Sequence, residues 1–354
     1  MGQNSSIGQC VSAFAVIVLT LYAIMGTKCL LSLCYAQTTK TKMDQAQTRS
    51  YLMKKFEAMG LRPQSRLGQN FLIDLNLLRL LHESGNITEN DVILEVGTGT
   101  GSLTAPMADK AAVVITVEID PVMQNLAKQE LFGRNNVRFF KIDILKNKNR
   151  LQDEVLDVIR EELSKPGTDG ERRQFKFVAN LPYNVATPLI SNLLLTDVPP
   201  SLMCVTIQKE LADRIVAKPR SKDWGALSLW IQAQCRAEIV RIMPPTVFWP
   251  RPKVDSAIIR LTLDEKRRNK IPDLKFYNEF CRAMFFHRRK FLRAELCSAF
   301  KYTIPKERID EIMDEMQFDV TTRAEALPLK TMQRLSELCR RELLKLPEKE
   351  RKIL

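Results

Sequence analysis

Short apolar runs of strand length recur along the middle of this chain and alternate with longer segments of helical periodicity. The runs lie at 92–96, 112–119, 137–143, 175–179 and 202–208. A short apolar run bounded by glycine or polar residues fits a strand that is buried on both faces. Strands that alternate with helices predict an α/β protein with a mainly parallel sheet.

The pattern changes toward the C-terminus. A helix at 209–216 and an apolar helix that ends at 233 precede a final strand pair, 237–243 and 254–263. Only helical patterns follow a charged linker at 265–270; they lie within 276–300, 304–316 and 331–344. We therefore predict an apolar leader at 1–45, an α/β domain at 46–264 and a small all-helical domain at 265–354.

A glycine-rich loop follows the first buried run. Gly97, Gly99 and Gly101 come directly after the strand, and a helix start follows them. Strand, glycine loop and helix N-terminus in this order are typical of nucleotide-binding α/β folds. Position 102 is Ser, so the spacing differs from that of dinucleotide binders. A loop that only packs the strand on the helix is the alternative.

Glu95 favours a ligand at this loop, because a carboxylate inside a buried strand is costly unless it has a polar role. A cationic ligand would supply that role. S-adenosylmethionine carries a sulfonium and an ammonium group and no phosphate. We therefore expect Glu95, Gly97 and Gly99 to contact this cofactor, with the glycines allowing close approach of the ligand to the backbone.

Acidic residues end the next two runs. Glu118 and Asp120 lie about twenty residues after Gly97, where α/β nucleotide sites place an acid for the two ribose hydroxyls. Asp143 ends the third run and is a candidate acceptor for the amino protons of an adenine. A surface acid at a strand end is the weaker alternative.

The fourth run ends in Asn180, Leu181, Pro182 and Tyr183. Sequences of this kind are typical of enzymes that methylate a planar amino group. The Asn180 side-chain oxygen and the Leu181 carbonyl would accept the two amino protons and free the nitrogen lone pair. Pro182 would fix the turn, and Tyr183 would stack on the base. A strand-ending turn with a surface tyrosine is the alternative.

A proline-rich loop at 244–252 is predicted to hold Phe248 and Trp249 outward. Phe248 would then be the second aromatic wall for a base that is turned out of its stack. Plain core packing is the alternative for Phe248.

Composition points to a polyanionic partner. The net charge is +13 and the pI is about 9.4, which favours nucleic acid or an anionic membrane. The eight cysteines are scattered without a Cys-x-x-Cys pair and there are only two histidines, so we expect no metal site. A reducing compartment fits this cysteine usage best.

Several ordered motifs resemble those of the small-subunit (16S) rRNA adenine N6,N6-dimethyltransferases. They are Gly-Gln-Asn-Phe-Leu (68–72), Glu-Val-Gly-Thr-Gly-Thr-Gly (95–101), Glu-Ile-Asp (118–120), Asn-Leu-Pro-Tyr-Asn (180–184), Gln-Lys-Glu (208–210), Phe-Trp-Pro-Arg-Pro-Lys-Val-Asp-Ser (248–256) and Arg-Arg-Lys (288–290). The resemblance covers residues 65 to about 344. It implies a class I Rossmann-like methyltransferase with a seven-stranded sheet and a helical C-terminal domain.

The resemblance also implies site residues and an activity. Cofactor contacts would fall on Asn70, Leu72, Gly97, Glu118, Asp143 and Asn180, and target-base contacts on Asn180, Leu181, Tyr183 and Phe248. The family dimethylates two adjacent adenines in a hairpin near the 3′ end of small-subunit rRNA. We expect a cytoplasmic monomer that acts on immature small ribosomal subunits. The alternatives are a resistance-type large-subunit rRNA adenine methyltransferase and a ribosome-assembly factor without turnover.

A basic cluster in the helical region is expected to contact RNA phosphates. It consists of Arg288, Arg289, Lys290 and Arg293. A solvated helix face is the alternative at nearly equal weight.

Two parts depart from the family pattern. Residues 10–27 carry no charge, and an apolar run resumes after Lys28, which is about the length of a membrane span. A signal peptide and a true start at Met43 are the other interpretations. We favour Met43, because export would separate the chain from its cofactor and substrate. The second departure is an insertion at 146–173, predicted as an amphipathic helix followed by a surface loop.

Overall fold

The computed structural model describes residues 48–64 and 67–351. The chain divides into two compact units, 1–62 and 63–354, which we describe separately. The described part of the first unit holds helix α3 (Arg49–Ala58), and the Thr48 side chain caps it by accepting a hydrogen bond from the Tyr51 amide. The predicted leader lies outside the described residues. Among the described helices, none has the length and apolar character of a membrane span.

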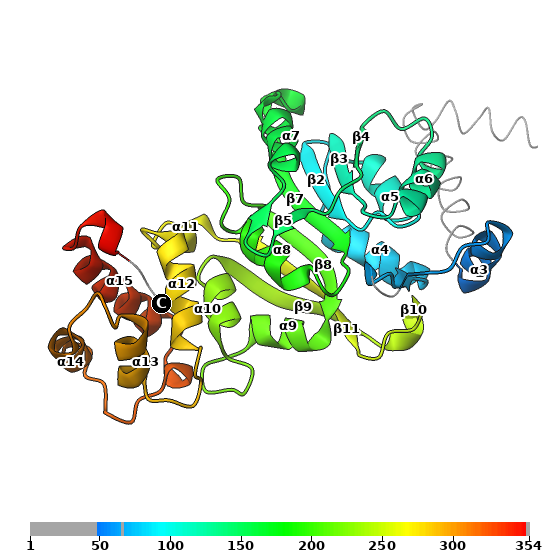
Figure 1. Cartoon of the computed structure of the whole chain (residues 1–354). Helices are drawn as coiled ribbons and strands as arrows, with labels where there is room; N and C mark the ends of the chain where they lie inside the picture. The colour runs from blue at the N-terminus through cyan, green and yellow to red at the C-terminus, as the bar shows by residue number, and fades with distance from the viewer. Residues whose placement is uncertain (1–47, 65–66, 352–354) are drawn as a thin grey trace, which may run out of the picture. The chain divides into compact units, whose positions relative to one another are not determined.

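A seven-stranded sheet forms the centre of the second unit, in the order β4-β3-β2-β7-β8-β11-β9 (Figure 1). Its parallel strands are β2 (Asp91–Val96), β3 (Val113–Val117), β4 (Val137–Phe140), β7 (Gln174–Asn180) and β8 (Leu202–Gln208). The strands β11 (Ser256–Leu263) and β9 (Cys235–Met243) complete it in antiparallel pairing. The predicted fold class is therefore confirmed.

Helices cover both faces of this sheet, which explains why its strands are apolar at nearly every position. One face packs against α4 (Leu75–Ser84), α5 (Thr104–Ala108) and α6 (Pro121–Glu130). The other packs against α7 (Asp153–Ser164), α8 (Ala186–Leu193), α9 (Lys209–Val216) and α10 (Ala226–Gln232). Along β2, Ile93 faces the first helix layer, whereas Val92 and Leu94 face the second.

Two small sheets flank the central one. β1 (Phe71–Leu72) pairs with β10 (Phe248–Trp249), which follows the 3-10 helix η3 (Pro245–Val247). β5 (Leu145–Asn147) pairs with β6 (Arg150–Leu151). The predicted helix from residue 146 is therefore wrong at its start, because a hairpin occupies 145–151 and the helix begins at Asp153.

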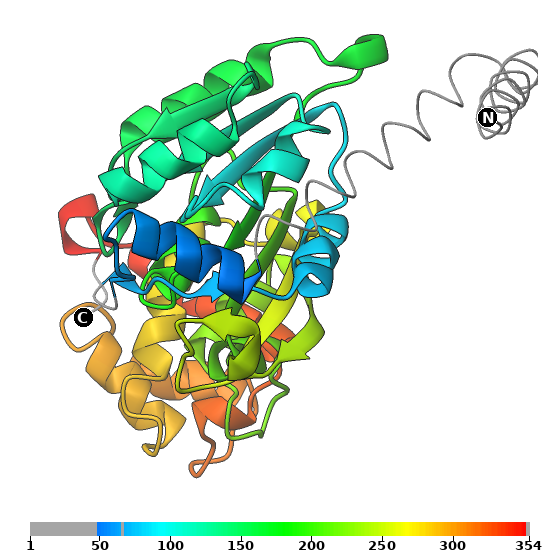
Figure 2. The same cartoon turned by 90° about the vertical axis from the view of Figure 1, so that its right-hand side faces the viewer.

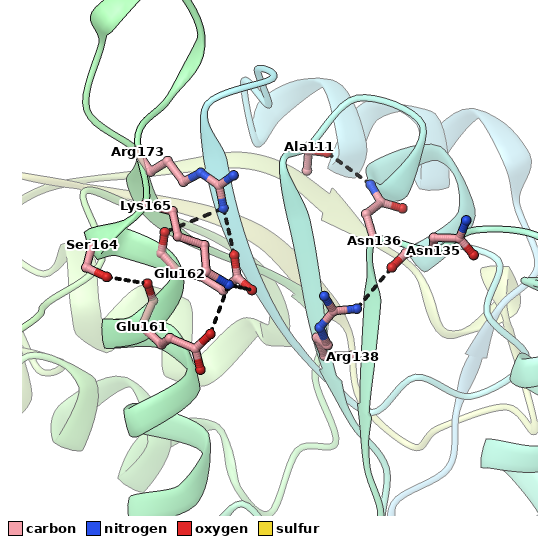
Figure 3. Close-up of polar contacts among 9 residues, drawn as sticks. All are labelled: Ala111, Asn135, Asn136, Arg138, Glu161, Glu162, Ser164, Lys165 and Arg173. Carbon is pink, nitrogen blue, oxygen red and sulfur yellow. Dashed lines mark hydrogen bonds and ion pairs between the residues drawn. The ribbon is translucent and has the colours of Figure 1, made fainter.

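The end of the insertion is held by ion pairs of Glu162 (Figure 3). Lys165 Nζ and Arg173 Nη1 donate to its carboxylate oxygens at 2.8 and 2.7 Å. Burial of Glu162 opposes ionisation, but these two cations outweigh it and hold the pKa of this carboxyl below its usual range. The segment that contains η2 (Thr168–Gly170) is thereby anchored to α7.

The C-terminal helices gather beside α10, yellow to red in both views (Figure 1, Figure 2). They are α11 (Glu265–Arg268), α12 (Leu274–Met284), α13 (Leu292–Ala299), α14 (Lys306–Glu315) and α15 (Leu329–Leu344), with the 3-10 turns η4 (Ala324–Ala326) and η5 (Glu348–Glu350). Their buried side chains continue the core of the adjacent sheet face. The domain boundary at 264/265 stays a prediction.

The charged segment at 265–270, predicted as a linker, is mostly helical. It holds the helix α11, capped by Asp264, and Arg268 is fixed to the sheet domain. The Arg268 guanidinium donates to the carbonyls of Leu194 and Thr196 at 2.6 and 3.1 Å. Carbonyls without other partners need such donors when they are buried, so this segment is an ordered joint between the two parts.

Candidate active site

Four of the motifs, 68–72, 95–101, 118–120 and 180–184, meet at the carboxyl ends of the parallel strands, around a cavity of about 120 Å³. This is where open α/β sheets bind ligands. The cavity is lined by these predicted site residues: Asn70, Gly97, Gly99, Glu118, Asp143, Asn180, Leu181 and Pro182. Four other predicted residues do not line it: Leu72, Glu95, Tyr183 and Phe248.

Close packing requires glycine at two positions of the loop. Gly97 and Gly99 have φ of +84° and +55°, which side-chain-bearing residues rarely adopt. A Cβ at Gly97 would lie 3.2 Å from Pro182 Cδ, and one at Gly99 would lie 3.3 Å from the Phe71 ring. The glycine loop therefore packs against the 68–72 and 180–184 motifs, and its backbone forms one wall of the cavity.

Glu118 presents an oriented carboxylate to the cavity. Its Oε2 accepts a hydrogen bond from the Gly99 amide and its Oε1 accepts one from the Asp120 amide, both at 2.9 Å. Burial raises the pKa of Glu118 above its usual value, although these amides oppose the shift. Each oxygen retains acceptor capacity, so the carboxylate can bind two vicinal hydroxyls.

Asp120 supports the site rather than facing the cavity. Its Oδ1 accepts from the Val122 amide and caps α6. Its Oδ2 accepts from Gln69 Nε2 at 2.8 Å and from Gln64 Nε2 at 3.2 Å. Gln69 thus ties the segment before β1 to the end of β3, a link between residues 51 positions apart that the sequence pattern did not reveal.

Glu95 lies behind the glycine loop. Its side chain is 1% exposed and does not line the cavity. Hydroxyls of Thr104 and Thr116 donate to its Oε2, each at 2.6 Å. Burial raises the pKa of Glu95 to about 8. These threonines supply hydrogen bonds to the buried carboxyl group, and direct contact between Glu95 and the cofactor stays a prediction.

Asn180, the last residue of β7, has its side-chain amide held at both ends. Nδ2 donates to the backbone oxygen of Asn70 at 3.0 Å, and Oδ1 accepts from the Thr206 hydroxyl. An amide oxygen has two lone pairs. Oδ1 can therefore accept one further hydrogen bond from a substrate.

The two aromatic residues predicted to stack on the target base, Tyr183 and Phe248, differ in burial. Tyr183 is half-buried, and its hydroxyl lies 2.6 Å from Ser256 Oγ; burial raises the pKa of this phenol. The prediction that the proline-rich loop holds Phe248 outward is wrong. Phe248 is 3% exposed and pairs with Leu72, because β10 forms a ladder with β1 and turns this ring into the core.

Apolar side chains complete the cavity and were missed from the sequence. Ile119 is 47% exposed, although it follows a buried strand, and it lines the cavity with Met123 and Ile142. An adenine ring would find flat apolar contacts here, beside Asp143. The only signal in the sequence is the large apolar residue between Glu118 and Asp120, which resembles ordinary core.

These residues fit S-adenosylmethionine. Glu118 has acceptors oriented for a ribose, Ile119 and Ile142 offer apolar walls for a base, and the bare backbone at Gly97 allows close approach. Within the described residues, no group of three or more His, Cys, Asp or Glu is arranged to hold a metal ion.

A family model described as ribosomal RNA adenine dimethylase matches residues 60–339, which is most of the chain. The chain belongs to the ribosomal RNA adenine dimethylase family. Curated relatives of this dimethylase are named ribosomal RNA small subunit methyltransferase A. The one from Listeria innocua is 38% identical over 286 residues, covering 80% of this chain and 92% of the relative. The one from Lachnoclostridium phytofermentans is 37% identical over 276 residues, covering 78% and 91%.

Two solved structures share the fold of this dimethylase. A dimethyladenosine transferase from Plasmodium falciparum has a TM-score of 0.61 at 22% identity, with 76% of this chain and 97% of that chain covered. The 23S rRNA methyltransferase ErmE has a TM-score of 0.52 at 22% identity, with 76% and 98% covered. At this identity both support the methyltransferase fold alone.

Three members of the basic cluster of the dimethylase, Arg288, Arg289 and Lys290, lie in the turn between α12 and α13, whereas Arg293 lies in the first turn of α13. Arg288 donates to Glu325 at 2.8 Å and to the Ser221 carbonyl at 3.0 Å, and Arg293 pairs with Asp310. Arg289 and Lys290 are exposed, and neither forms an ion pair with another residue within 48–64 or 67–351. Arg288 is therefore a structural joint as well as a candidate RNA contact.

Proposed function

We propose that this protein transfers methyl groups from S-adenosylmethionine to the N6 amines of two adjacent adenosines in the 3′-terminal hairpin of small-subunit rRNA. The substrate would be the immature small subunit, and the enzyme would act as a cytoplasmic monomer with a role in subunit biogenesis. The observation that carries the proposal is the contact of the 180–182 segment with a cavity built for a nucleoside.

The cofactor would be held by residues that line this cavity. Glu118 would bind its ribose, Asp143 and Ile119 its adenine, and the backbone near Gly97 and Asn70 its amino-acid part. When bound, it supplies an activated methyl group.

The target amine would lie at the end of β7. Asn180 Oδ1 and the Leu181 carbonyl would accept its two protons, which favours a pyramidal nitrogen with its lone pair directed at the methyl donor. Positioning then supplies most of the catalysis. After transfer the nitrogen is acidic enough to lose its proton to solvent, so no catalytic base is required. Tyr183 would stack on the base.

Phe248 stays a candidate for the second stacking face. Because its ring is buried against Leu72, it would reach a base only after the loop at 244–252 moves away from β1.

Relatives named for the small subunit, at 37–38% identity over most of the chain, favour this substrate over the large subunit. The likeness to ErmE concerns the fold only. An intact site around Asn180 argues against an assembly factor without turnover.

Methyl transfer to small subunits that lack the modification tests the proposal. Tritium from labelled cofactor should enter the subunits with the native protein and not with Asn180→Ala, which should retain most of its cofactor affinity by calorimetry. Primer extension would map the label to two adjacent adenosines. Label in large subunits only would refute the proposed substrate, and equal turnover by Asn180→Ala would refute the role of that side chain.

A further inference from the structure

Thr206 lies beside Asn180 on the neighbouring strand. β7 and β8 run parallel with Asn180 opposite Thr206, and Thr206 is fully buried. Its hydroxyl donates to Asn180 Oδ1. None of the motifs discussed above includes Thr206.

The Asn70 carbonyl sets the orientation of the Asn180 amide, and the Thr206 hydroxyl then fixes the position of its oxygen. An amide oxygen only accepts and an amide NH₂ only donates, so Thr206 must act as the donor. The carbonyl of Asn70 accepts from Nδ2 at 3.0 Å. A flipped amide would set Oδ1 against the Asn70 carbonyl, which places two acceptors together and loses that hydrogen bond, and the Thr206 hydroxyl would then accept from Nδ2 instead of donating to Oδ1.

We propose that Thr206 is a positioning residue for methyl transfer, because its hydroxyl holds the Asn180 oxygen toward the target amine. The inference rests on the proposed function. Without the hydroxyl, Oδ1 loses its only protein hydrogen bond among the described residues, so the amide is held at Nδ2 alone and its oxygen can tilt away from the target amine. Turnover should then suffer more than cofactor binding, because Thr206 does not line the cofactor cavity.

The test compares Thr206→Val, which keeps the shape and removes the donor, with Thr206→Ser, which keeps the donor. Cys204→Ala is the matched control, since Cys204 is buried two residues earlier on the same strand and contacts the Leu81 carbonyl rather than Asn180. Single-turnover transfer, cofactor affinity and melting temperature are measured for each. In protein labelled with ¹⁵N-asparagine, the Asn180 side-chain amide is observed directly.

Thr206→Val should lower the transfer rate about tenfold, leave cofactor affinity within about twofold, and broaden or shift the Asn180 amide signals. Thr206→Ser should restore the rate, and Cys204→Ala should change only the melting temperature. If Thr206→Val does not fold, Thr206→Ala takes its place with the same outcomes.

An unchanged rate in Thr206→Val would overturn the inference. So would a Thr206→Ser protein as slow as Thr206→Val, which would indicate packing, or a loss confined to cofactor affinity. Failure of the native protein to methylate small subunits would instead refute the proposed function, and the amide spectra of Thr206→Val would still report on the hydrogen bond.

Discussion

Replacing Glu95 by Gln removes a carboxyl group buried behind the glycine loop, and it should change how stability depends on pH. The folded protein holds this proton up to about pH 8, because burial raises the pKa of Glu95 from its ordinary value of 4.5. The unfolded chain releases it near that ordinary value. Between these values the unfolded state binds fewer protons, so the free energy of unfolding falls as pH rises.

The size of the effect follows from the shift. One pKa unit corresponds to about 1.4 kcal/mol, so the stability contributed by protonated Glu95, fully present below about pH 4.5, declines by about 3 kcal/mol between pH 5.5 and 8.0. Gln has the same shape and no titration. Any cost of its NH₂ group beside Thr104 and Thr116 is the same at every pH and cancels from the slope.

Urea unfolding of the native protein and of Glu95→Gln at pH 5.5, 6.5 and 8.0 measures this difference. The native protein should lose stability relative to Glu95→Gln as pH rises. Glu279→Gln, an exposed position on α12, controls for the loss of one negative charge. A constant difference between native protein and Glu95→Gln across this range would refute the raised pKa and reopen the question of a cationic partner for Glu95.

Two further outcomes are expected. Gly97→Ala should cost about 1–3 kcal/mol in urea unfolding and weaken cofactor binding in calorimetry, because its Cβ meets Pro182. Gly133 has a similar φ of +87° with open space around it, so Gly133→Ala should lower the free energy of unfolding without changing cofactor affinity. Equal cofactor affinity in the two variants would contradict the proposed packing of the Gly97 backbone against the cofactor. Replacing Arg289 and Lys290 by Ala should reduce the slope of log affinity for rRNA against log salt by about 1.5, whereas Lys110→Ala should not; an unchanged slope would exclude both from phosphate contact.

Local signals in the sequence predicted most of the fold. The apolar run at 202–208 and the helix after it have the predicted bounds as β8 and α9. Asp74 is an acidic residue directly before α4 and caps it, because its side chain accepts from the amides of Asn76 and Leu77. These features depend on residues close to one another along the chain, where periodicity and capping are informative.

The errors concern contacts between distant segments. The Phe248 side chain was expected to point outward. Its partner in the β1–β10 ladder, Leu72, lies far away along the chain, and no local sequence pattern indicates that the two residues pair. The threonine partners of Glu95, 9 and 21 residues away, likewise leave no signal in the spacing. A buried polar residue demands a partner, but the sequence does not say which one.

Sheet topology explains why two hydroxyls reach the same motif. Because β11 runs antiparallel to the parallel strands, its first residue lies at the sheet edge where those strands end. Ser256, the first residue of β11, therefore lies at the same edge as Asn180, the last residue of β7. The register places Thr206 opposite Asn180 and Ser256 opposite Gln208. Thr206 therefore holds Asn180, and Ser256 lies within hydrogen-bond distance of the Tyr183 hydroxyl. The antiparallel direction of β11 thus places Ser256 where it can support Tyr183. A one-residue slip in the register of β11 would move Ser256 to the opposite face of the sheet and remove this contact.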